Sequence, residues 1–205
     1  MIVNQYVASS VEFQGVIVTQ EADIPRSETV VFRLDKAFDG KLMFRMPYWL
    51  AGKATITVNG CGYDYAVVSG YAVVEGPFAA KTEIILTLPM KVVAYNLPDG
   101  ANTYGFKYGP VVLSALLGTK DMVDTTTGVN VTIPSERIIE AAYVPSGSEK
   151  IRVTEGSVEE YMSRIEQYLV RQGEKLSFVL NGTDANLTFV PHYSQHKERY
   201  GIYFK

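Results

Sequence analysis

Short segments in which apolar and polar residues alternate recur along most of the chain. Successive side chains of a β-strand point to opposite faces, so this period of two predicts strands with one buried face. β-branched and aromatic residues dominate these segments, and no period of 3.6 residues appears among them. Seven of the segments lie in the first ninety residues, at 2–7, 16–20, 29–35, 41–46, 54–59, 71–75 and 83–88.

Residues that favour turns separate these seven segments. They include Pro25 and the pairs Asp39–Gly40, Asn59–Gly60 and Ser69–Gly70. Regular spacing of short strands is typical of an antiparallel sandwich rather than of βαβ units. We therefore predict a jelly-roll-like β-sandwich over residues 1–98. Asn59 and Gly60 both tolerate positive φ, as a two-residue type I′ hairpin requires, although a longer loop reaching Gly62 fits the sequence equally well.

The rest of the chain, 99–205, is predicted to form a second β-rich unit with one helix. In the segment 157–171, apolar residues recur at helical spacing, Ser157 and Glu160 form a capping box, and Gly173 can end the helix. Residues 119–135 are rich in Thr, Asp and Gly and predict a mobile loop or linker. The predicted strands lie at 103–109, 111–117, 176–180, 187–190 and 200–204. The fold class is thus mainly β, with two antiparallel sandwich-like units and an amphipathic helix in the second.

The composition excludes several classes of function. The 22 acidic and 19 basic side chains give a net charge of −3, so nucleic acid and anionic membranes are not expected partners. A single cysteine, Cys61, excludes an intrachain disulfide framework and a metal centre built on several thiolates. No membrane span or signal peptide is recognisable, and we expect a soluble protein that is cytoplasmic by default.

Two groups of residues invite a chemical interpretation. His192 and His196 have the spacing of zinc ligands on a helix, with Glu198 nearby. Pro191 and the flanking strands place them in a loop, however, and no third ligand has a recognisable spacing. Cys61 has no neighbouring histidine or helix N-terminus to lower its pKa. We predict neither a metal site nor a catalytic thiol.

Other candidates are carboxylates and aromatic rings. Four carboxylates in the first unit could supply an acid and a base, but the sequence does not bring two of them together; they are Glu12, Glu21, Asp23 and Glu28. With 14 Tyr, 9 Phe and 1 Trp, the chain could build either a sugar-stacking surface or a sandwich core. Tyr48 and Trp49 follow Pro47 at a strand end, where side chains can face outward.

The closing segment carries a separate expectation. A period of two places Tyr200, Ile202 and Phe204 on one face of the last strand, and this face should be part of the core. Arg199 precedes the strand, and we expect its guanidinium to pair with a carboxylate or with backbone carbonyls and so hold the loop 191–198.

Several strings, in order, resemble one family over nearly the whole chain. They are NQYVASSVEF, VTQEADIP, FRMPYWLAGKATITVNG, LTLPMKVVAY, YGFKYGPVVLSALLG and FVPHYSQHKERYGIYF. They look like the C-terminal, non-catalytic part of glycoside hydrolase family 127 (GH127), the β-L-arabinofuranosidase-like family long labelled a domain of unknown function. The weakest stretch is 119–150. Where the family often has two adjacent histidines before the Arg199–Tyr200 pair, this chain has Gln195 and His196.

The resemblance implies an architecture more than a chemistry. Such enzymes have an (α/α)6 barrel that carries a zinc-held cysteine nucleophile and a glutamate acid/base, and two β-sandwich domains follow it. No catalytic, cofactor-binding or metal residue of that barrel can be carried onto this sequence, because the cluster of cysteines cannot exist with Cys61 alone. The family also adds a short segment from near its start to the second sandwich. If strands are missing here, an open edge would remain for another copy to cover, which makes a homo-oligomer one expectation.

The sequence thus predicts a non-catalytic accessory module of a glycoside hydrolase, which packs on a catalytic barrel and has no enzymatic activity by itself. The alternative is a carbohydrate-binding module that uses exposed aromatic rings. The expected contacts with carbohydrate or with the neighbouring domain are Tyr48, Trp49, His192, His196 and Arg199.

Overall fold

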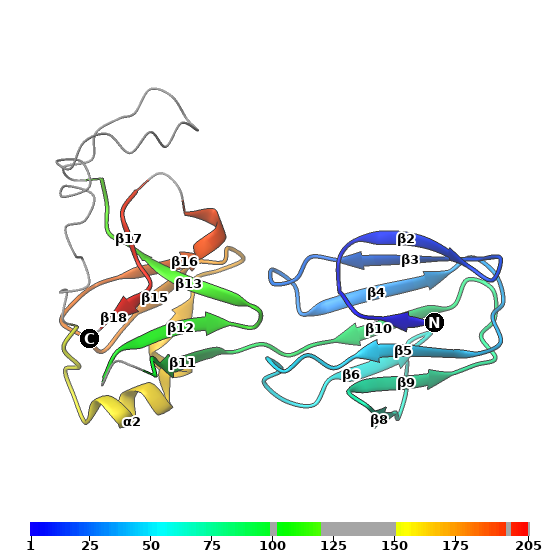
Figure 1. Ribbon diagram of the computed structural model, residues 1–205, viewed down its shortest axis with the longest axis horizontal. Coiled ribbons are helices and arrows are strands. Elements are labelled where there is room, and N and C mark those ends of the chain that lie inside the picture. Colours follow the sequence, from blue (N-terminus) through cyan, green and yellow to red (C-terminus); the bar gives the residue numbers. More distant parts are fainter. Residues whose placement is uncertain (99–101, 120–150, 196–197, 205) are drawn as a thin grey trace. The chain divides into compact units, whose positions relative to one another are not determined.

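Two sheets stack face to face in the first unit, which spans residues 1–91, and a curled sheet with short helices forms the second unit, 92–205 (Figure 1). The computed structural model describes residues 1–98, 102–119, 151–195 and 198–204. Apart from Thr119, the loop predicted at 119–135 lies outside these residues. The described part of the chain contains no helix long and apolar enough to cross a membrane.

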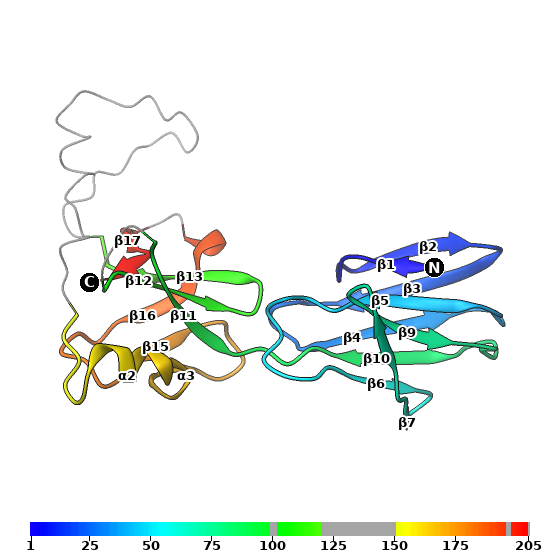
Figure 2. The ribbon, with the colours of Figure 1, turned by 60° about the horizontal axis from the view of Figure 1, so that its bottom comes forward.

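The first unit has the predicted sandwich architecture. One sheet has the order β1 (Ile2–Val3), β5 (Lys41–Arg45), β9 (Tyr71–Glu75) and β8 (Ala66–Val68). The other has the order β2 (Ser9–Phe13), β3 (Val16–Ala22), β4 (Thr29–Leu34), β10 (Glu83–Thr87), β6 (Thr55–Val58) and β7 (Cys61–Gly62). Only the pairing of β1 with β5 is parallel among these strands. β1 and β2 lie at one side of the sandwich and β7 at the opposite side (Figure 2).

The alternating residues fill the space between the sheets. Val30, Phe32 and Leu34 of β4 are buried, and so are Leu42 and Phe44 of β5. The rings of Phe32 and Phe44 come from opposite sheets and lie 4.7 Å apart. Burying each such side chain contributes about 1.5–3 kcal/mol, so this layer stabilises the unit.

The Asn59–Gly60 hairpin has the predicted two-residue turn. Both residues have positive φ, 50° and 79°, and Val58 pairs with Cys61 across the turn. The Asn59 amide donates to the carbonyl of Glu83, and its side-chain oxygen accepts from the Glu83 amide. The turn is therefore also tied to β10.

The start of the chain differs from the prediction. The strand expected at 2–7 is only β1, whereas Ser9–Phe13 forms a strand, β2, that the sequence pattern did not indicate. The Gln20 side-chain amide donates to the carbonyls of Gln5 and Val7. These bonds hold the chain where it crosses from one sheet to the other, which ends the first strand early.

One curled sheet makes up most of the second unit. Its order is β11 (Val92–Asn96), β12 (Tyr104–Tyr108), β13 (Val111–Leu116), β16 (Thr188–Pro191), β15 (Phe178–Leu180) and β14 (Leu169–Arg171). The sequence placed the boundary between the units after residue 98, but β11 pairs along its length with β12. Pro98 therefore lies in the connection between these two strands and not between the units. The units divide after Lys91.

The predicted helix begins as expected and ends early. The Ser157 hydroxyl accepts from the Glu160 amide, and α2 spans Val158–Ser163. A break at Arg164 separates it from α3 (Ile165–Tyr168). The expectation of one helix over 157–171 is wrong in its last part, because Leu169 to Arg171 pair with β15. Sheet pairing overrides the helical period there.

The closing segment forms two short strands instead of one. β17 (Tyr200–Gly201) pairs with β13, and β18 (Tyr203–Phe204) pairs with β12. β12 and β13 pair with each other only nearer their shared turn, so the segment lies between their diverging ends. Phe204 is buried as predicted, but Tyr200 is 43% exposed. The bend between the two strands breaks the alternation that placed Tyr200 in the core.

Phe204 should be essential to the second unit. Its ring lies 6.3 Å from that of Phe106 and 5.3 Å from that of Phe189. Replacing it (Phe204→Ala) should lower the free energy of unfolding of this unit by about 3–5 kcal/mol. The control Tyr203→Ala, on the exposed side of the same strand, should cost at most about 1.5 kcal/mol. Urea unfolding of both variants measures this, and similar losses in the two would contradict the assignment of Phe204 to the core.

Candidate functional site

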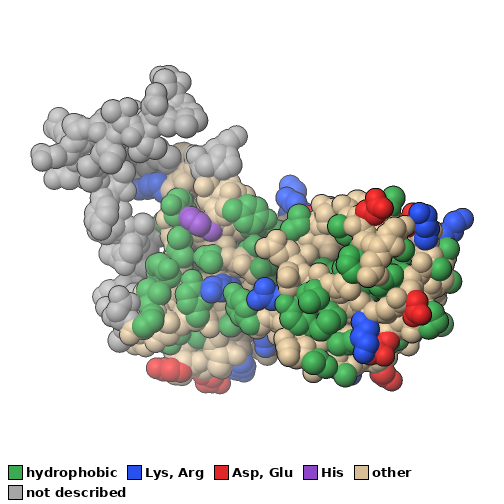
Figure 3. Space-filling model, turned by 45° about the vertical axis from the view of Figure 1, so that its right-hand side comes forward, with side chains coloured by type: hydrophobic (Ala, Val, Ile, Leu, Met, Phe, Trp, Pro, Cys, Tyr) green, Lys and Arg blue, Asp and Glu red, His purple; other side chains and the backbone are tan. Residues whose placement is uncertain are grey.

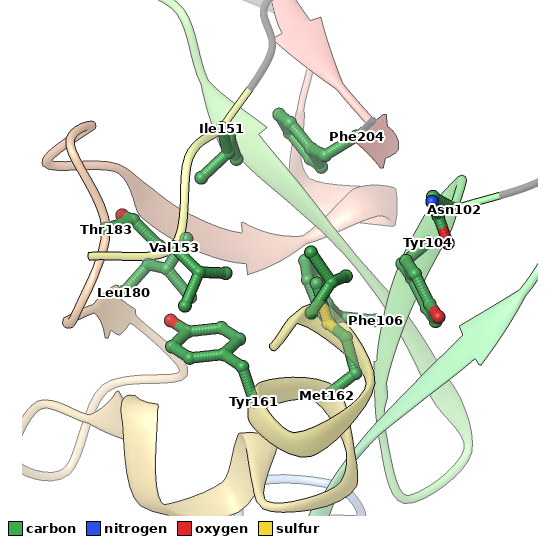
Figure 4. Close-up of a pocket in the computed structure, with 11 residues that line it drawn as sticks. Asn102, Tyr104, Phe106, Ile151, Val153, Tyr161, Met162, Leu180, Thr183 and Phe204 are labelled. Atoms are coloured by element: carbon green, nitrogen blue, oxygen red, sulfur yellow. The ribbon is translucent and has the colours of Figure 1, made fainter. Parts of the chain in front are cut away.

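A small apolar cavity lies between α2 and the sheet of the second unit (Figure 4). Tyr161 and Met162 project into it from α2, and Val153, Leu180 and Phe204 line it from other elements. Its volume is about 40 Å³, which is room for a few water molecules but not for a sugar ring. The cavity is a gap in the packing rather than a substrate pocket.

Tyr161 is the one titratable group in this cavity with a strongly shifted pKa. Burial, and secondarily the neighbouring Tyr168, raises the pKa of Tyr161 to about 12. Its hydroxyl donates to the carbonyl of Asn181, and the two tyrosine rings stack with centroids 4.2 Å apart. The phenol therefore stays protonated near neutral pH and acts as a structural donor, not as a catalytic base.

The structure places two of the predicted contact residues, His192 and Arg199, in the second unit. His192 opens a 3-10 turn, η2 (His192–Ser194), and its ring lies 4.8 Å from that of Tyr200. Arg199 precedes Tyr200 and is fixed by its backbone, which donates to Gly118 and accepts from Leu117. Among the described residues, the buried Nε of Arg199 and Nδ1 of His192 have no hydrogen-bond partner. The backbone of Arg199 therefore makes hydrogen bonds that hold this segment, and the expected pairing of its guanidinium with a carboxylate or with backbone carbonyls stays a prediction. His196 lies outside the described residues.

Tyr48 and Trp49 lie in the first unit and have opposite environments. Trp49 packs against the sandwich core, whereas Tyr48 is 86% exposed. The Leu50 amide donates to the Pro47 carbonyl across this turn. The turn therefore presents Tyr48 to its surroundings.

A flat stacking platform does not form at Tyr95 and Tyr203, of which the first is half-buried and the second exposed. Tyr95 and Tyr203 flank Gly105 on neighbouring strands, and a side chain at Gly105 would meet the Tyr95 ring at 2.6 Å. The two rings stand at 88°, and the Lys107 ammonium lies 4.8 Å from the centre of the Tyr95 ring. Stacking on sugars uses accessible ring faces, and here one face is covered by backbone.

Three of the four carboxylates considered from the sequence are engaged in contacts of their own. Glu21 pairs with Arg33, and Asp23 pairs with Arg26 at 3.3 Å. Glu28 accepts from the Met90 amide at 2.7 Å. Cys61 is exposed in its hairpin, and in the described ranges no three His, Cys, Asp or Glu side chains lie together as metal ligands would. Acidic and basic side chains are interspersed on the face of the first unit drawn in Figure 3.

Two further hollows belong to the first unit. One, of about 200 Å³, opens between β1 and β2. The other, of about 480 Å³, is a shallow depression lined by Glu21, Asp23 and residues near them. No sequence pattern marks the first hollow, because its position depends on where the two sheet edges meet.

Comparison with known families accounts for nearly the whole chain. The family described as "Beta-L-arabinofuranosidase, GH127 middle domain" matches residues 1–90, and DUF4986, a domain of unknown function, matches residues 93–205. Residues 1–90 belong to the GH127 middle-domain family, and residues 93–205 belong to DUF4986. The two matches meet where the structure divides into its two units, and the region corresponds to the non-catalytic domains of GH127 enzymes.

Solved structures of glycoside hydrolases have a similar fold. A GH127 β-L-arabinofuranosidase from Geobacillus stearothermophilus T6 is 27% identical, with a TM-score of 0.50 over 56% of this chain and 20% of that chain. A glycoside hydrolase is 19% identical, with a TM-score of 0.59 over 99% and 35% of the two chains. A GH127 β-arabinofuranosidase is 13% identical, with a TM-score of 0.59 over 99% and 34%. The chain spans about a third or less of these proteins. Comparison with curated protein sequences found no match.

The buried hydroxyl of Ser114 allows a test of how the second unit is packed. It is fully buried on β13, and its hydroxyl has no partner among the described residues. Removing this hydroxyl (Ser114→Ala) should raise the free energy of unfolding by about 1 kcal/mol. Ser157→Ala, which removes the cap of α2, should lower it by about 1 kcal/mol. Urea unfolding gives both values, and a loss for Ser114→Ala would show that the hydroxyl is satisfied in solution.

Proposed function

We propose that this chain is a non-catalytic accessory module of a GH127 glycoside hydrolase and that it packs against the catalytic domain of that enzyme. The observation that carries the proposal is the pair of adjacent family matches, at 1–90 and 93–205. In the related structures the same region is only 35% or 34% of the chain. The remaining two thirds of such an enzyme would supply the catalytic barrel and the activity on β-L-arabinofuranosides.

The chemistry of the described residues supports a structural role. The resemblance implies a catalytic cysteine held by zinc together with further cysteines, and Cys61 is the single cysteine of the chain. The carboxylates Glu21, Asp23 and Glu28 are engaged in ion pairs or backbone contacts. We expect Tyr48, Trp49, His192, His196 and Arg199 to contact the neighbouring domain rather than to take part in hydrolysis.

The second candidate function is carbohydrate binding, and the exposure of Tyr48 favours it. A ring that is 86% exposed on a held turn can stack on a sugar. Trp49, the only tryptophan of the chain, follows it and would report such binding through its fluorescence. Saturable quenching by arabino-oligosaccharides that is lost in Tyr48→Ala, but kept in Tyr193→Ala, would support this candidate.

The accessory role predicts that the chain alone does not hydrolyse aryl β-L-arabinofuranosides. We expect no release of the aryl group above the rate in buffer, because no activated nucleophile faces an acid within the described residues. The intact Geobacillus enzyme serves as the positive control. Turnover that co-purifies with the chain and disappears in Cys61→Ser or Glu21→Gln would overturn the proposal.

A further inference from the structure

The sheet that contains β5 and β9 ends in β8, and in the described part of the chain no strand pairs with the outer side of β8 (Figure 1). The three residues of this strand, Ala66, Val67 and Val68, are all exposed. Val67 is 56% exposed although it pairs with the buried Ala72 of β9. An apolar edge strand that has neither a proline nor a charged residue is a template for pairing with another chain.

The hairpin that joins β8 to β9 determines which backbone groups of β8 are free. Ser69 and Gly70 form its turn, with φ of 52° and 84°. In such a two-residue turn the flanking residues, here Val68 and Tyr71, hydrogen-bond to each other. Hydrogen-bonded and non-bonded pairs alternate along an antiparallel ladder, so the preceding residue, Val67, directs its N–H and C=O away from β9. A strand that adds to this edge would therefore bond to Val67.

The other edge strands of the described sheets are shorter, charged or covered. β1 and β7 have two residues each. β2 contains Glu12 and β14 contains Arg171, and charged side chains oppose association of two edges. α3 packs against β11. Among the described sheets, β8 is therefore the edge best suited to pairing.

Two charged side chains lie on the outer face of the same sheet. Asp64 is two residues before Ala66, so the period of two places it on the face that Ala66 and Val68 share. Arg45 of β5 pairs with Tyr71, which in turn pairs with Val68. Asp64 and Arg45 are both exposed, and neither forms an ion pair within the described residues. Each is thus available to a partner.

We propose that β8 is the interface of a symmetric dimer, in which it pairs antiparallel with β8 of a second copy of this chain. A two-fold axis at Val67 places the two Val67 residues opposite each other, and their outward N–H and C=O groups bond across the axis. Ala66 then lies opposite Val68 of the second copy. No like charges meet in this register, and the two four-stranded sheets become one.

The charges favour a second copy over an unrelated apolar strand. In the same register Asp64 lies opposite Gly70 of the second copy, next to the row of Tyr71 and Arg45. Symmetry gives two such pairs of opposite charge, Asp64 of each copy with Arg45 of the other. An unrelated apolar strand would satisfy the backbone of Val67 but would leave both charges without a partner.

The expected dimer is weak. Pairing of three residues from each copy buries much less than the roughly 1,600 Å² of a standard interface, so the dimer should form only as the concentration rises. The interface does not depend on the proposed accessory role, and either inference can fail while the other stands.

Sedimentation equilibrium of the full chain, at concentrations up to about 1 mM, tests the dimer. Val67→Lys puts two ammonium groups opposite each other at the axis and should weaken the dimer by roughly tenfold or more. The matched control is Val11→Lys, at a valine that is 52% exposed on the edge strand β2. This control should change the dissociation constant less than about twofold.

Charge reversal tests the register. Asp64→Arg alone and Arg45→Asp alone should each weaken the dimer by about fivefold, because each brings like charges together. The double variant Asp64→Arg/Arg45→Asp restores opposite charges and should return most of the loss. A variant that is merely misfolded would show no such restoration. Failure of the double variant to recover would overturn the proposed register.

Other outcomes would overturn the interface itself. A chain that stays monomeric up to about 1 mM has no such dimer, and a dimer that Val67→Lys and Val11→Lys weaken equally does not use β8. If circular dichroism shows that Val67→Lys is not folded, amide exchange of the parent chain decides. Exchange of the Val67 amide should slow as the concentration rises, whereas that of the Val68 amide, which faces β9, should not change. A Val67 rate independent of concentration would contradict the proposal.

Discussion

The contact between the two sheets of the first unit is the interaction on which the rest of that unit depends. Phe32 and Phe44 come from different sheets, and the alternating residues of β4, β5, β9 and β10 close around them. Because the period of two sends every second side chain into this layer, the residues between them face outward on both sheets. Fewer side chains of the outer strands β1 and β2 are buried in this layer. The side of the sandwich between these two strands is therefore open.

The sequence predicted the parts of the fold in which one face of a strand is buried. Val30, Phe32 and Leu34 alternate with more exposed residues, and β4 was recognised from them. β2 was missed because its residues are exposed on both faces, as suits an edge strand, so no alternation marks it. The helix was recognised from Tyr161, Ile165 and Leu169, all buried at a spacing of four. Leu169, however, pairs with Leu180 and therefore lies in a strand and not in the helix.

The candidate sites were less predictable than the fold. Pro47, Tyr48 and Trp49 suggested an outward turn, yet only the packed structure separates Trp49, which is partly buried against the core, from the exposed Tyr48. The sequence also could not indicate that the buried Nδ1 of His192 and Nε of Arg199 have no hydrogen-bond partner among the described residues. This depends on how β13, η2 and β17 pack together. The family, by contrast, was recognised from the order of short strings, because such strings keep the turn and strand-end residues that a shared backbone requires.

The pairings of the last two strands, β17 and β18, affect the order in which the parts of the chain fold. β18 pairs Phe204 with Tyr104, and β17 pairs Tyr200 with Leu116, so these contacts join residues far apart in the sequence. The pairings of the first unit all fall within residues 2–87. During synthesis from the N-terminus, the sandwich can therefore fold while the second unit is still emerging from the ribosome. The second unit completes its sheet only when β17 and β18 are available, and until then the sides of β12 and β13 that face each other at their diverging ends have no strand to pair with.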